Sequence, residues 1–536
     1  MANRIFSIST LSALMIVLGL VSLASGQSTR LRYEEGDWVS YTDFRYVNSI
    51  SVGHQYIYFG TTGGVTRYDR YLSRWDTPYT MSDGLYENWI ERVAYDPANE
   101  YIWCLTRSGY INYYHPTEKR WHTTSSIPTG LLLTNPPPIE YPDFITDFKY
   151  TFFTEGYNAT LQDRNLRTYP IHWSVIDNWD IMWIATWGLN AGTADMRTQK
   201  LEMLQFGLIE PNVASMIFDD SDMWFAGIGE LQGSQGITRF NRNSTEWSYF
   251  EARLIDGLRS DNVTSMAADS QFVWFGTYDG LAQLNKNKKS WKTYTILQGL
   301  SDNVVIDLAL DGERLWIGTA FGLCSTDRKT GDITKVSNEN IATAIVYDVQ
   351  VDTDRIWAAT NRGLFFKPRE RKEWEYFEDR QDHLGGVVVD MVADSESVWF
   401  AALPSWAIDE RLFFQTEAHE LITGRPSIPG KESLPISLFL SVFDKESSQW
   451  QQYFPPGIYS FGTIYDLAIN DRAAWIATDE GVLKFDRLRN TWRRFSIEDG
   501  LLHNTVQTIL LDGDYVWFGT PQGATRFYWN DPFRID

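Results

Sequence analysis

The sequence predicts an all-β protein made of about ten copies of a four-stranded antiparallel unit. Three observations predict this fold: a tryptophan-centred motif recurs along the chain, its copies are spaced about 42 residues apart, and the short runs within each copy lack helical periodicity. The chain has 536 residues, 43% of them hydrophobic, which excludes a disordered or collagen-like protein. The two cysteines, Cys104 and Cys324, are too few for a disulfide scaffold, and we expect both in the core.

The recurring motif reads as a strand, a turn and a second strand. Its fullest copies are Val-Trp-Phe-Gly-Thr-Tyr-Asp-Gly-Leu from Val273, Leu-Trp-Ile-Gly-Thr-Ala-Phe-Gly-Leu from Leu315 and Val-Trp-Phe-Gly-Thr-Pro-Gln-Gly-Ala from Val516. In several copies a second tryptophan follows after 17 or 18 residues, and the next copy begins its motif 25 residues later. The motif tryptophans, with Tyr58 in the same place in the first copy, are Trp103, Trp183, Trp224, Trp274, Trp316, Trp357, Trp399, Trp475 and Trp517.

Each period holds four short strands. The first is an apolar run such as Asn303 to Leu310, the second is the Trp-Ile-Gly-Thr run, the third follows Gly-Leu, and the fourth surrounds the second tryptophan. Gly, Asp and Asn between the runs favour tight turns, so the unit is an antiparallel meander. One such sheet cannot bury both of its faces alone, and four-stranded units of this length stack radially as the blades of a β-propeller.

The two ends of the repeat region complement each other. The last copy stops after its third strand, Ala524 to Tyr528, whereas residues 36–42 resemble a fourth strand that has no first three. We therefore expect Trp38 to Thr42 to pair with Ala524 to Tyr528, which leaves no open sheet edge. Ten blades exceed the roughly four to eight of a single propeller, so residues 27–536 form either one large ring or two fused rings.

Residues 1–26 have the pattern of a secretory signal peptide. A positively charged start precedes the apolar stretch Leu11 to Ala24, and small residues lie before Gln27. An uncleaved anchor helix is the alternative. No later stretch reaches the ~20 apolar residues that span a bilayer, so we expect an exported protein, periplasmic or extracellular, with no membrane span in its mature chain.

Two irregular spacings predict insertions at about 129–165 and about 403–435, the first of which could hide a degenerate blade. Alternate strand connections of a propeller emerge on opposite faces, and strand counting places both insertions on the same rim. Aromatic groups beside a few polar ones suit a sugar or a peptide, although packing of the insertions onto the ring is the alternative explanation. The predicted ligand-binding residues are Tyr141, Phe153, Tyr157, Trp187, Trp406 and Arg411.

The repeat resembles the two-component regulator propeller repeat. That pattern, Gly-Leu, two residues, Asn, an apolar strand, an acidic turn and Trp-Ile-Gly-Thr-x-x-Gly-Leu, is seen from Gly299 to Leu323 and again from Gly500 to Ala524. The resemblance implies a propeller like the extracytoplasmic sensor parts of hybrid histidine kinases, which often bind oligosaccharides. We expect no membrane or kinase part after Asp536, so the resemblance implies the fold and not the kinase function.

Composition and motifs limit the classes of function that this protein can have. A formal charge of −22 makes nucleic acid an improbable partner. Acidic pairs such as Asp352 and Asp354 could hold a cation but suit tight turns better, and we expect no metal, no cofactor and no catalytic residues. The leading hypothesis is an exported non-enzymatic propeller of the cell envelope that binds an oligosaccharide, a peptide or another envelope protein. The alternative is a lyase or glycan-active enzyme with its site in the central funnel.

The second insertion gives the first testable prediction. Replacing Leu403 to Pro435 with a short Gly-containing turn should leave the propeller folded, because loop length has little effect on loop-closure entropy, but should abolish ligand or partner binding. Substituting Trp406 and Arg411 together should weaken binding while the melting temperature stays within a few degrees of the unmodified protein. Normal binding by the trimmed protein would contradict the assignment.

Overall fold

The computed structural model of this chain is almost entirely β-structure. Its described residues form nine four-stranded sheets and one six-stranded sheet, with three short 3-10 helices in the connections, which confirms the predicted propeller of about ten antiparallel units. Residues 1–26 lie outside the described part, and no helix within that part is long and apolar enough to cross a membrane. The described residues are 33–128, 150–155, 158–229, 236–379, 382–403, 440–455 and 463–534.

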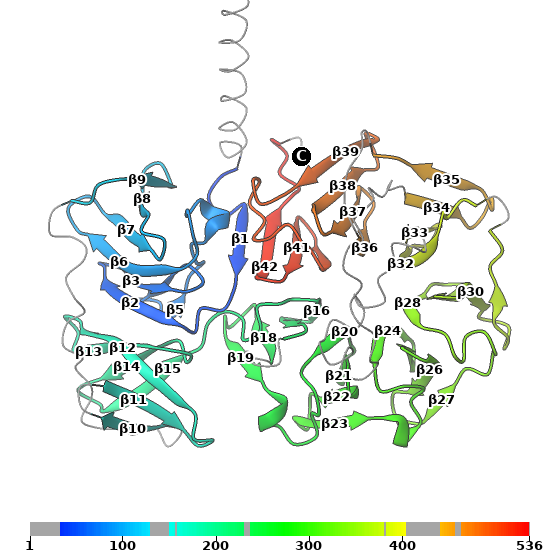
Figure 1. Ribbon diagram of the computed structural model, residues 1–536, viewed down its shortest axis with the longest axis horizontal. Coiled ribbons are helices and arrows are strands. Elements are labelled where there is room, and N and C mark those ends of the chain that lie inside the picture. Colours follow the sequence, from blue (N-terminus) through cyan, green and yellow to red (C-terminus); the bar gives the residue numbers. More distant parts are fainter. Residues whose placement is uncertain are drawn as a thin grey trace, which may run out of the picture.

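Seven sheets surround a common axis and form a closed ring (Figure 1). The first strand of each ring sheet contacts the first strand of the next, and β40 contacts β16 to complete the circle. The first six sheets are β16 (Ser215–Asp219), β17 (Asp222–Ala226), β18 (Ile237–Asn241), β19 (Trp247–Phe250); β20 (Val263–Ala268), β21 (Phe272–Thr277), β22 (Gly280–Asn285), β23 (Ser290–Tyr294); β24 (Val305–Asp311), β25 (Arg314–Thr319), β26 (Gly322–Asp327), β27 (Ile333–Lys335); β28 (Val346–Val351), β29 (Arg355–Thr360), β30 (Gly363–Pro368), β31 (Glu375–Tyr376); β32 (Val387–Ala393), β33 (Ser397–Leu403), β34 (Leu440–Asp444), β35 (Trp450–Tyr453); β36 (Ile464–Ile469), β37 (Ala473–Thr478), β38 (Gly481–Asp486) and β39 (Thr491–Phe495). The seventh is β40 (Thr508–Asp512), β41 (Tyr515–Thr520), β42 (Gly523–Tyr528) and β1 (Trp38–Tyr41).

The other three sheets stack beside the ring and are called the arc below (Figure 1). The chain enters the arc directly after β1 and returns to the ring at β16, and within the arc β2 contacts both β6 and β12. The sheets of the arc are β2 (Val47–Val52), β3 (Tyr56–Thr61), β4 (Val65–Asp69), β5 (Arg74–Trp75); β6 (Ile90–Asp96), β7 (Tyr101–Thr106), β8 (Ile111–His115), β9 (Arg120–Thr124); and β10 (Tyr150–Glu155), β11 (Asn158–Asp163), β12 (Thr168–Ile176), β13 (Ile181–Thr186), β14 (Ala191–Asp195), β15 (Lys200–Leu204).

The Gly-Thr-x-x-Gly motif forms the turn between the second and third strands of a sheet. Thr277 Oγ1 donates a hydrogen bond to the Gly280 carbonyl at 2.7 Å. Gly280 has a φ of +112°, and a Cβ there would lie 2.3 Å from the Tyr294 carbonyl oxygen, so only glycine fits this position. The same Thr-to-Gly bond closes the turns at Thr319, Thr360, Thr478 and Thr520.

In four sheets the acidic residue before the motif tryptophan accepts a hydrogen bond from the indole N–H. Asp352 Oδ1 accepts hydrogen bonds from the backbone N–H of Asp354 and of Arg355, and its Oδ2 accepts from Trp357 Nε1 at 3.1 Å. Equivalent indole-to-aspartate bonds join Trp183 to Asp177, Trp316 to Asp311 and Trp517 to Asp512. These acidic pairs therefore serve as turns, the interpretation that the sequence favoured over a cation site.

The Gly-Leu-x-x-Asn motif belongs to a capped turn between sheets. The 3-10 helix η3 (Ile296–Gln298) is capped by Thr295, whose side chain accepts from the Leu297 N–H, and it ends at the left-handed Gly299. Asn303 Oδ1 then accepts from the Ile296 N–H at 2.9 Å, which folds the following strand back onto the turn. The helix η1 (Met81–Asp83) has the same arrangement, whereas η2 (Ala252–Leu254) lacks the side-chain cap.

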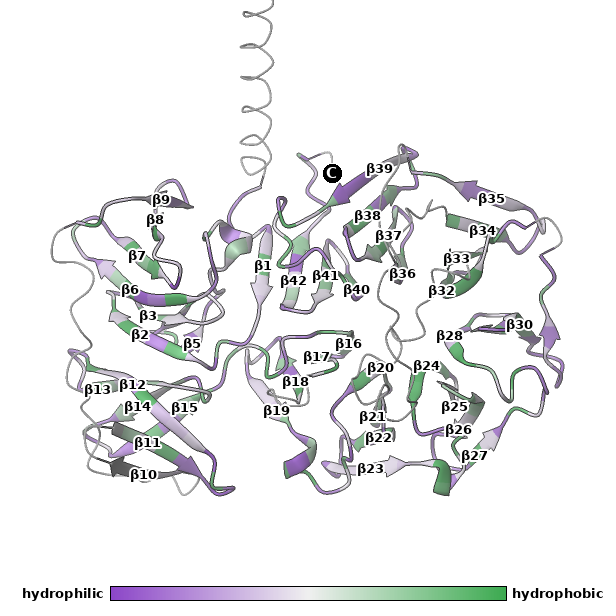
Figure 2. Ribbon diagram, viewed as in Figure 1, coloured by the Kyte–Doolittle hydropathy of each residue, from purple (hydrophilic) through white to green (hydrophobic). Residues whose placement is uncertain are grey.

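Apolar side chains fill the spaces between neighbouring sheets, and the hydrophobic stretches lie along the strands (Figure 2). The indoles of Trp224, Trp274, Trp357 and Trp475 are at most 1% exposed. Cys104 and Cys324 are buried free thiols, as expected of core residues. Most tryptophan in this chain is therefore packing between sheets.

The first insertion enlarges the last sheet of the arc. Strands β10 and β11 pair with each other and with the start of β12, giving the six-stranded sheet. Trp183 and Ala185 of this sheet pack toward β2 and β3, whereas Met182 and Ile184 pack with Leu161 of β11. The added strands therefore cover the face that points away from the neighbouring sheet.

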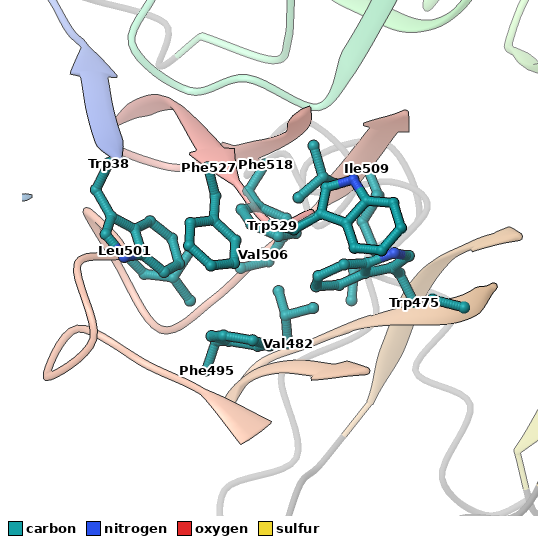
Figure 3. Close-up of a cluster of buried hydrophobic side chains, with 13 residues drawn as sticks. Trp38, Trp475, Val482, Phe495, Leu501, Val506, Ile509, Phe518, Phe527 and Trp529 are labelled. Atoms are coloured by element: carbon teal, nitrogen blue, oxygen red, sulfur yellow. The ribbon is translucent and has the colours of Figure 1, made fainter. Parts of the chain in front are cut away.

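The predicted closure of the last blade is confirmed. Strand β1 pairs antiparallel with β42, with Trp38 opposite Phe527 and Tyr41 opposite Ala524. The Trp38 ring is 2% exposed and stacks on Phe527 with their centroids 3.9 Å apart (Figure 3). A Cβ at Gly500 would lie 2.5 Å from this indole, so the glycine makes room for it.

Ring closure yields the second prediction. Trp38→Ala should lower the free energy of unfolding by about 3–5 kcal/mol, because it empties a fully buried aromatic site in the strand that completes the seventh sheet. Chemical denaturation monitored by circular dichroism measures this loss. Trp179→Ala is the matched control, since Trp179 is 39% exposed and should cost far less. Equal effects of the two substitutions would contradict the closing role of Trp38.

Candidate functional site

A polar cavity lies on the axis of the ring. In five of the ring sheets the first strand carries a register shift, and a bulge of this kind turns side chains toward the axis. The cavity has a volume of about 260 Å³ and is lined from all seven sheets. The lining residues that repeat around it are Ser215, Ser265, Asp307, Asp348, Asp390, Asp466 and Thr508.

Most of these axial side chains bind the backbone of the next sheet. Asp307 Oδ2 accepts from the Val349 N–H at 2.9 Å, and Asp466 Oδ2 accepts from the Ile509 N–H at 2.6 Å. Asp348 Oδ2 and Ser265 Oγ accept from the corresponding N–H groups of their following sheets. The carboxyls thus form a belt of hydrogen bonds that ties neighbouring sheets together around the axis.

Burial raises the pKa of three of the axial carboxyls. Desolvation raises the pKa of Asp466 to about 6. Desolvation and then repulsion from Asp307 raise the pKa of Asp348, and desolvation followed by repulsion from Asp348 does the same at Asp390. Asp390 Oδ2 is buried without a hydrogen-bond partner in the described part of the chain. Within that part, no group of three or more His, Cys, Asp and Glu residues is placed to hold a metal ion.

A second candidate site lies in the arc, where the corresponding bulges carry different residues. The register shifts in β6 and β12 fall at Glu91 and His172. The His172 imidazole stacks on Trp187 at 5.0 Å, and the Trp187 ring also meets Tyr46 at 5.0 Å and Trp89 at 6.3 Å. We call Tyr46, Trp89, His172 and Trp187 the aromatic cluster; its members come from all three sheets of the arc or their adjoining loops.

Polar groups border the aromatic cluster. Trp89 Nε1 donates to Glu91 Oε1 at 3.0 Å, and the exposed Arg107 guanidinium lies 4.1 Å from the Trp89 ring centroid. Desolvation lowers the pKa of His172, so its imidazole is neutral at neutral pH. Flat aromatic faces beside a few hydrogen-bonding groups can bind a ligand that combines an apolar face with polar edges.

Of the predicted ligand-binding residues, Trp187 is the one whose side chain is described, and it lies in the aromatic cluster. Phe153 lies in β10, but its side chain is outside the described residues. The predicted shared rim of the two insertions is not tested, because the second insertion, which joins β33 to β34, is not described. Tyr141, Tyr157, Trp406 and Arg411 also lie outside the described residues.

Sequence reasoning missed Tyr46, Trp89 and His172. One signal could have found Trp89: like Trp187, it falls outside the repeating tryptophan positions, so blade packing does not explain it. Tyr46 and His172 carry no such signal. The bulge that brings His172 to the inner edge of its sheet is a feature of strand pairing and cannot be read from local sequence.

Comparisons with known proteins do not decide the function of this chain. No protein-family model and no curated protein matches the chain. A similar solved structure is PorZ, a surface component of the type-IX secretion system of Porphyromonas gingivalis, with 14% identity over 90% of this chain and 68% of PorZ and a TM-score of 0.47. Others are the extracellular domain of a putative hybrid two-component system of B. thetaiotaomicron (14% identity, 92% and 82% covered, TM-score 0.32) and streptogramin B lyase (13%, 61% and 96%, TM-score 0.41).

The axial carboxyls give the third prediction. A folded-state pKa above the unfolded value means that the folded protein binds more protons, so this contribution to stability falls as pH rises from about 4 through the folded pKa. Asp390→Asn removes the buried charge and should raise the free energy of unfolding at pH 8 by about 1–3 kcal/mol, with a smaller gain at pH 5. Urea denaturation at both pH values measures the difference.

Asp352→Asn is a control that should change the free energy of unfolding in the opposite direction. Hydrogen bonds from Asp354, Trp357 and Lys445 outweigh burial and lower the pKa of Asp352, so this substitution should destabilise the protein at pH 8. A loss of stability at pH 8 in the Asp390 variant would mean that its carboxylate contributes favourably to the folded ring.

Proposed function

We propose that this protein is an exported, non-enzymatic propeller of the cell envelope that binds an oligosaccharide, a peptide or another envelope protein through the aromatic cluster of the arc. The observation that carries the proposal is the meeting of Tyr46, Trp89, His172 and Trp187, which come from three different sheets. Loops and strand ends on a rigid scaffold are where recognition groups usually lie. The Trp89 and Trp187 side chains are only partly buried, unlike the motif tryptophans, so they remain available to a ligand.

The chemistry of the two candidate sites supports binding over catalysis. An enzyme needs a convergent set of acid, base or nucleophile at a place where a substrate can sit. The carboxyls that converge on the ring axis are mostly engaged with backbone N–H groups of neighbouring sheets. The aromatic cluster offers flat faces and hydrogen-bond donors, which are recognition groups.

The second candidate function is a lyase or glycan-active enzyme that uses the axial cavity. One observation favours it: burial raises the pKa of Asp466 to about 6, and Asp390 Oδ2 has no hydrogen-bond partner among the described residues, so a proton donor and acceptor occur in one cavity. This enzyme would lose turnover in the Asp390→Asn variant, whereas the binding protein would form no product at all.

The fourth prediction tests the aromatic cluster. Trp187→Ala and Trp89→Ala should each weaken binding by about ten-fold or more, because partly buried tryptophans that contact a ligand contribute about 1–3 kcal/mol each. Glycan arrays and peptide libraries identify a ligand, and titration calorimetry then gives the affinities.

Trp179→Ala is the matched control, because this exposed tryptophan precedes β13 whereas Trp187 follows it, which places the two at opposite ends of the same strand. Unchanged affinity in both cluster variants would reject the site. Product formation by the unmodified protein would favour the enzyme.

A further inference from the structure

The chain crosses between the ring and the arc twice, and the two crossings lie against each other. Residues 42–45 lead from β1 to the first sheet of the arc, and residues 206–210 lead from the arc back to the ring. An antiparallel bridge joins Asp43 to Gly207. A Cβ at Gly207 would lie 2.5 Å from Phe44 Cδ2, so the crossings approach too closely for a larger residue. We call residues 42–45 and 206–210 the junction.

A buried ion pair holds the two crossings together. Arg45 is 8% exposed, and its guanidinium donates to both carboxylate oxygens of Asp43, from Nε to Oδ1 at 2.9 Å and from Nη2 to Oδ2 at 2.7 Å. The same Nη2 donates to the Ile209 carbonyl of the other crossing at 2.9 Å. The Arg45 carbonyl accepts from the N–H groups of Gly188 and Asn190, in the turn after β13. The ion pair therefore ties both crossings to the last sheet of the arc.

Glu210 lies at the end of the second crossing and carries a buried carboxyl. It is 6% exposed, and its Oε1 accepts from the Asn212 N–H at 2.9 Å. Its Oε2 is buried without a hydrogen-bond partner among the described residues. Ionisation of a carboxyl in such a place is costly, because neither water nor a full set of donors solvates the charge. Burial therefore favours the protonated form of Glu210.

The charged groups around Glu210 come from the junction itself and from the ring. Desolvation is the largest effect on its pKa, and repulsion from Asp43 and from Asp261, which precedes β20, adds to it. The Asn212 N–H and the attraction to Arg45 act in the opposite direction. The balance raises the pKa of Glu210 to about 7, so its charge changes near neutral pH.

Two further titratable groups at the junction keep one charge state near neutral pH. Against desolvation, the Asp43 carboxylate raises the pKa of Arg45, so the guanidinium stays charged. The Tyr249 hydroxyl of β19 donates to the Gly207 carbonyl at 3.1 Å, and burial raises the pKa of Tyr249, so this hydroxyl stays neutral. Neither group changes its charge between pH 6 and pH 8.

We propose that the junction is a pH-sensitive switch that holds the arc firmly to the ring while Glu210 is protonated and less firmly once Glu210 is ionised. When Glu210 releases its proton to the solvent, a carboxylate is left in a buried site beside the Asp43 carboxylate. Opening of the junction lets water solvate this charge, so ionisation favours the open form. No residue of the junction belongs to the aromatic cluster, so the switch stands independently of the proposed function.

Hydrogen exchange of the full chain, followed by mass spectrometry, tests the switch. In water the pKa of a glutamate is about 4.3. The closed junction raises it, so the closed form binds more protons than the open form, and its stability falls as the pH rises through about 7. After correction for the intrinsic exchange rate, the protection of peptides that cover the junction should fall about ten-fold between pH 6 and pH 8, the factor expected for one proton. Protection that stays constant over this range would overturn the proposal.

Two variants assign the effect to one carboxyl. Glu210→Gln keeps an acceptor for the Asn212 N–H and removes the titratable group, so its junction should be equally protected at pH 6 and pH 8. Asp390→Asn is the matched control, because it removes a buried carboxyl of the ring axis and should leave the ten-fold fall at the junction unchanged. A fall that persists in Glu210→Gln, or that disappears in Asp390→Asn, would assign the pH dependence to another group and overturn the proposal. If Glu210→Gln fails to fold, the unmodified protein and the Asp390 variant still decide the question.

Discussion

Each four-stranded sheet of this protein has two apolar faces, and neither is stable in water. The ring meets this constraint by placing every sheet between two others, and β1 completes the seventh sheet so that the circle closes. The arc has three sheets and cannot close in this way. At one end the hairpin of β10 and β11 covers the outer face of the last sheet, which gives the first insertion a packing role.

The repeat motif serves this stacking at several levels. Its tryptophan fills the space between sheets, and its acidic residue closes the preceding turn and in several sheets holds the indole N–H. Its Thr side chain donates a hydrogen bond to the carbonyl of its Gly, and the position of that Gly has no room for a Cβ. Because each element satisfies polar groups locally, the sheets can pack their apolar faces tightly without leaving backbone groups unpaired.

The first strands of the ring sheets and of the arc sheets contain similar bulges but carry different side chains there. In the ring the axial carboxyls Asp348 and Asp390 directly follow the unpaired residue of the bulge, whereas in the arc His172 is itself the unpaired residue. In the closed ring the carboxyls lie close to the next sheet, where they become acceptors for its backbone. In the arc the inner edges carry aromatic groups that remain partly accessible. The axial carboxyls therefore serve the packing of the ring, and the aromatic cluster of the arc is the surface that we propose for recognition.

The sequence by itself determined the all-β class, the four-stranded unit, its number of copies and the pairing of the first strand with the last. These follow from local rules: turn residues, strand periodicity and an incomplete terminal copy. Of the candidate site, it identified Trp187, which falls outside the packing positions. Only the tertiary structure decided that seven sheets close while three remain an arc, and which side chains meet at the axis and in the aromatic cluster. Such meetings depend on the angle between stacked sheets and on bulges in their inner strands, and residues far apart in the chain set both.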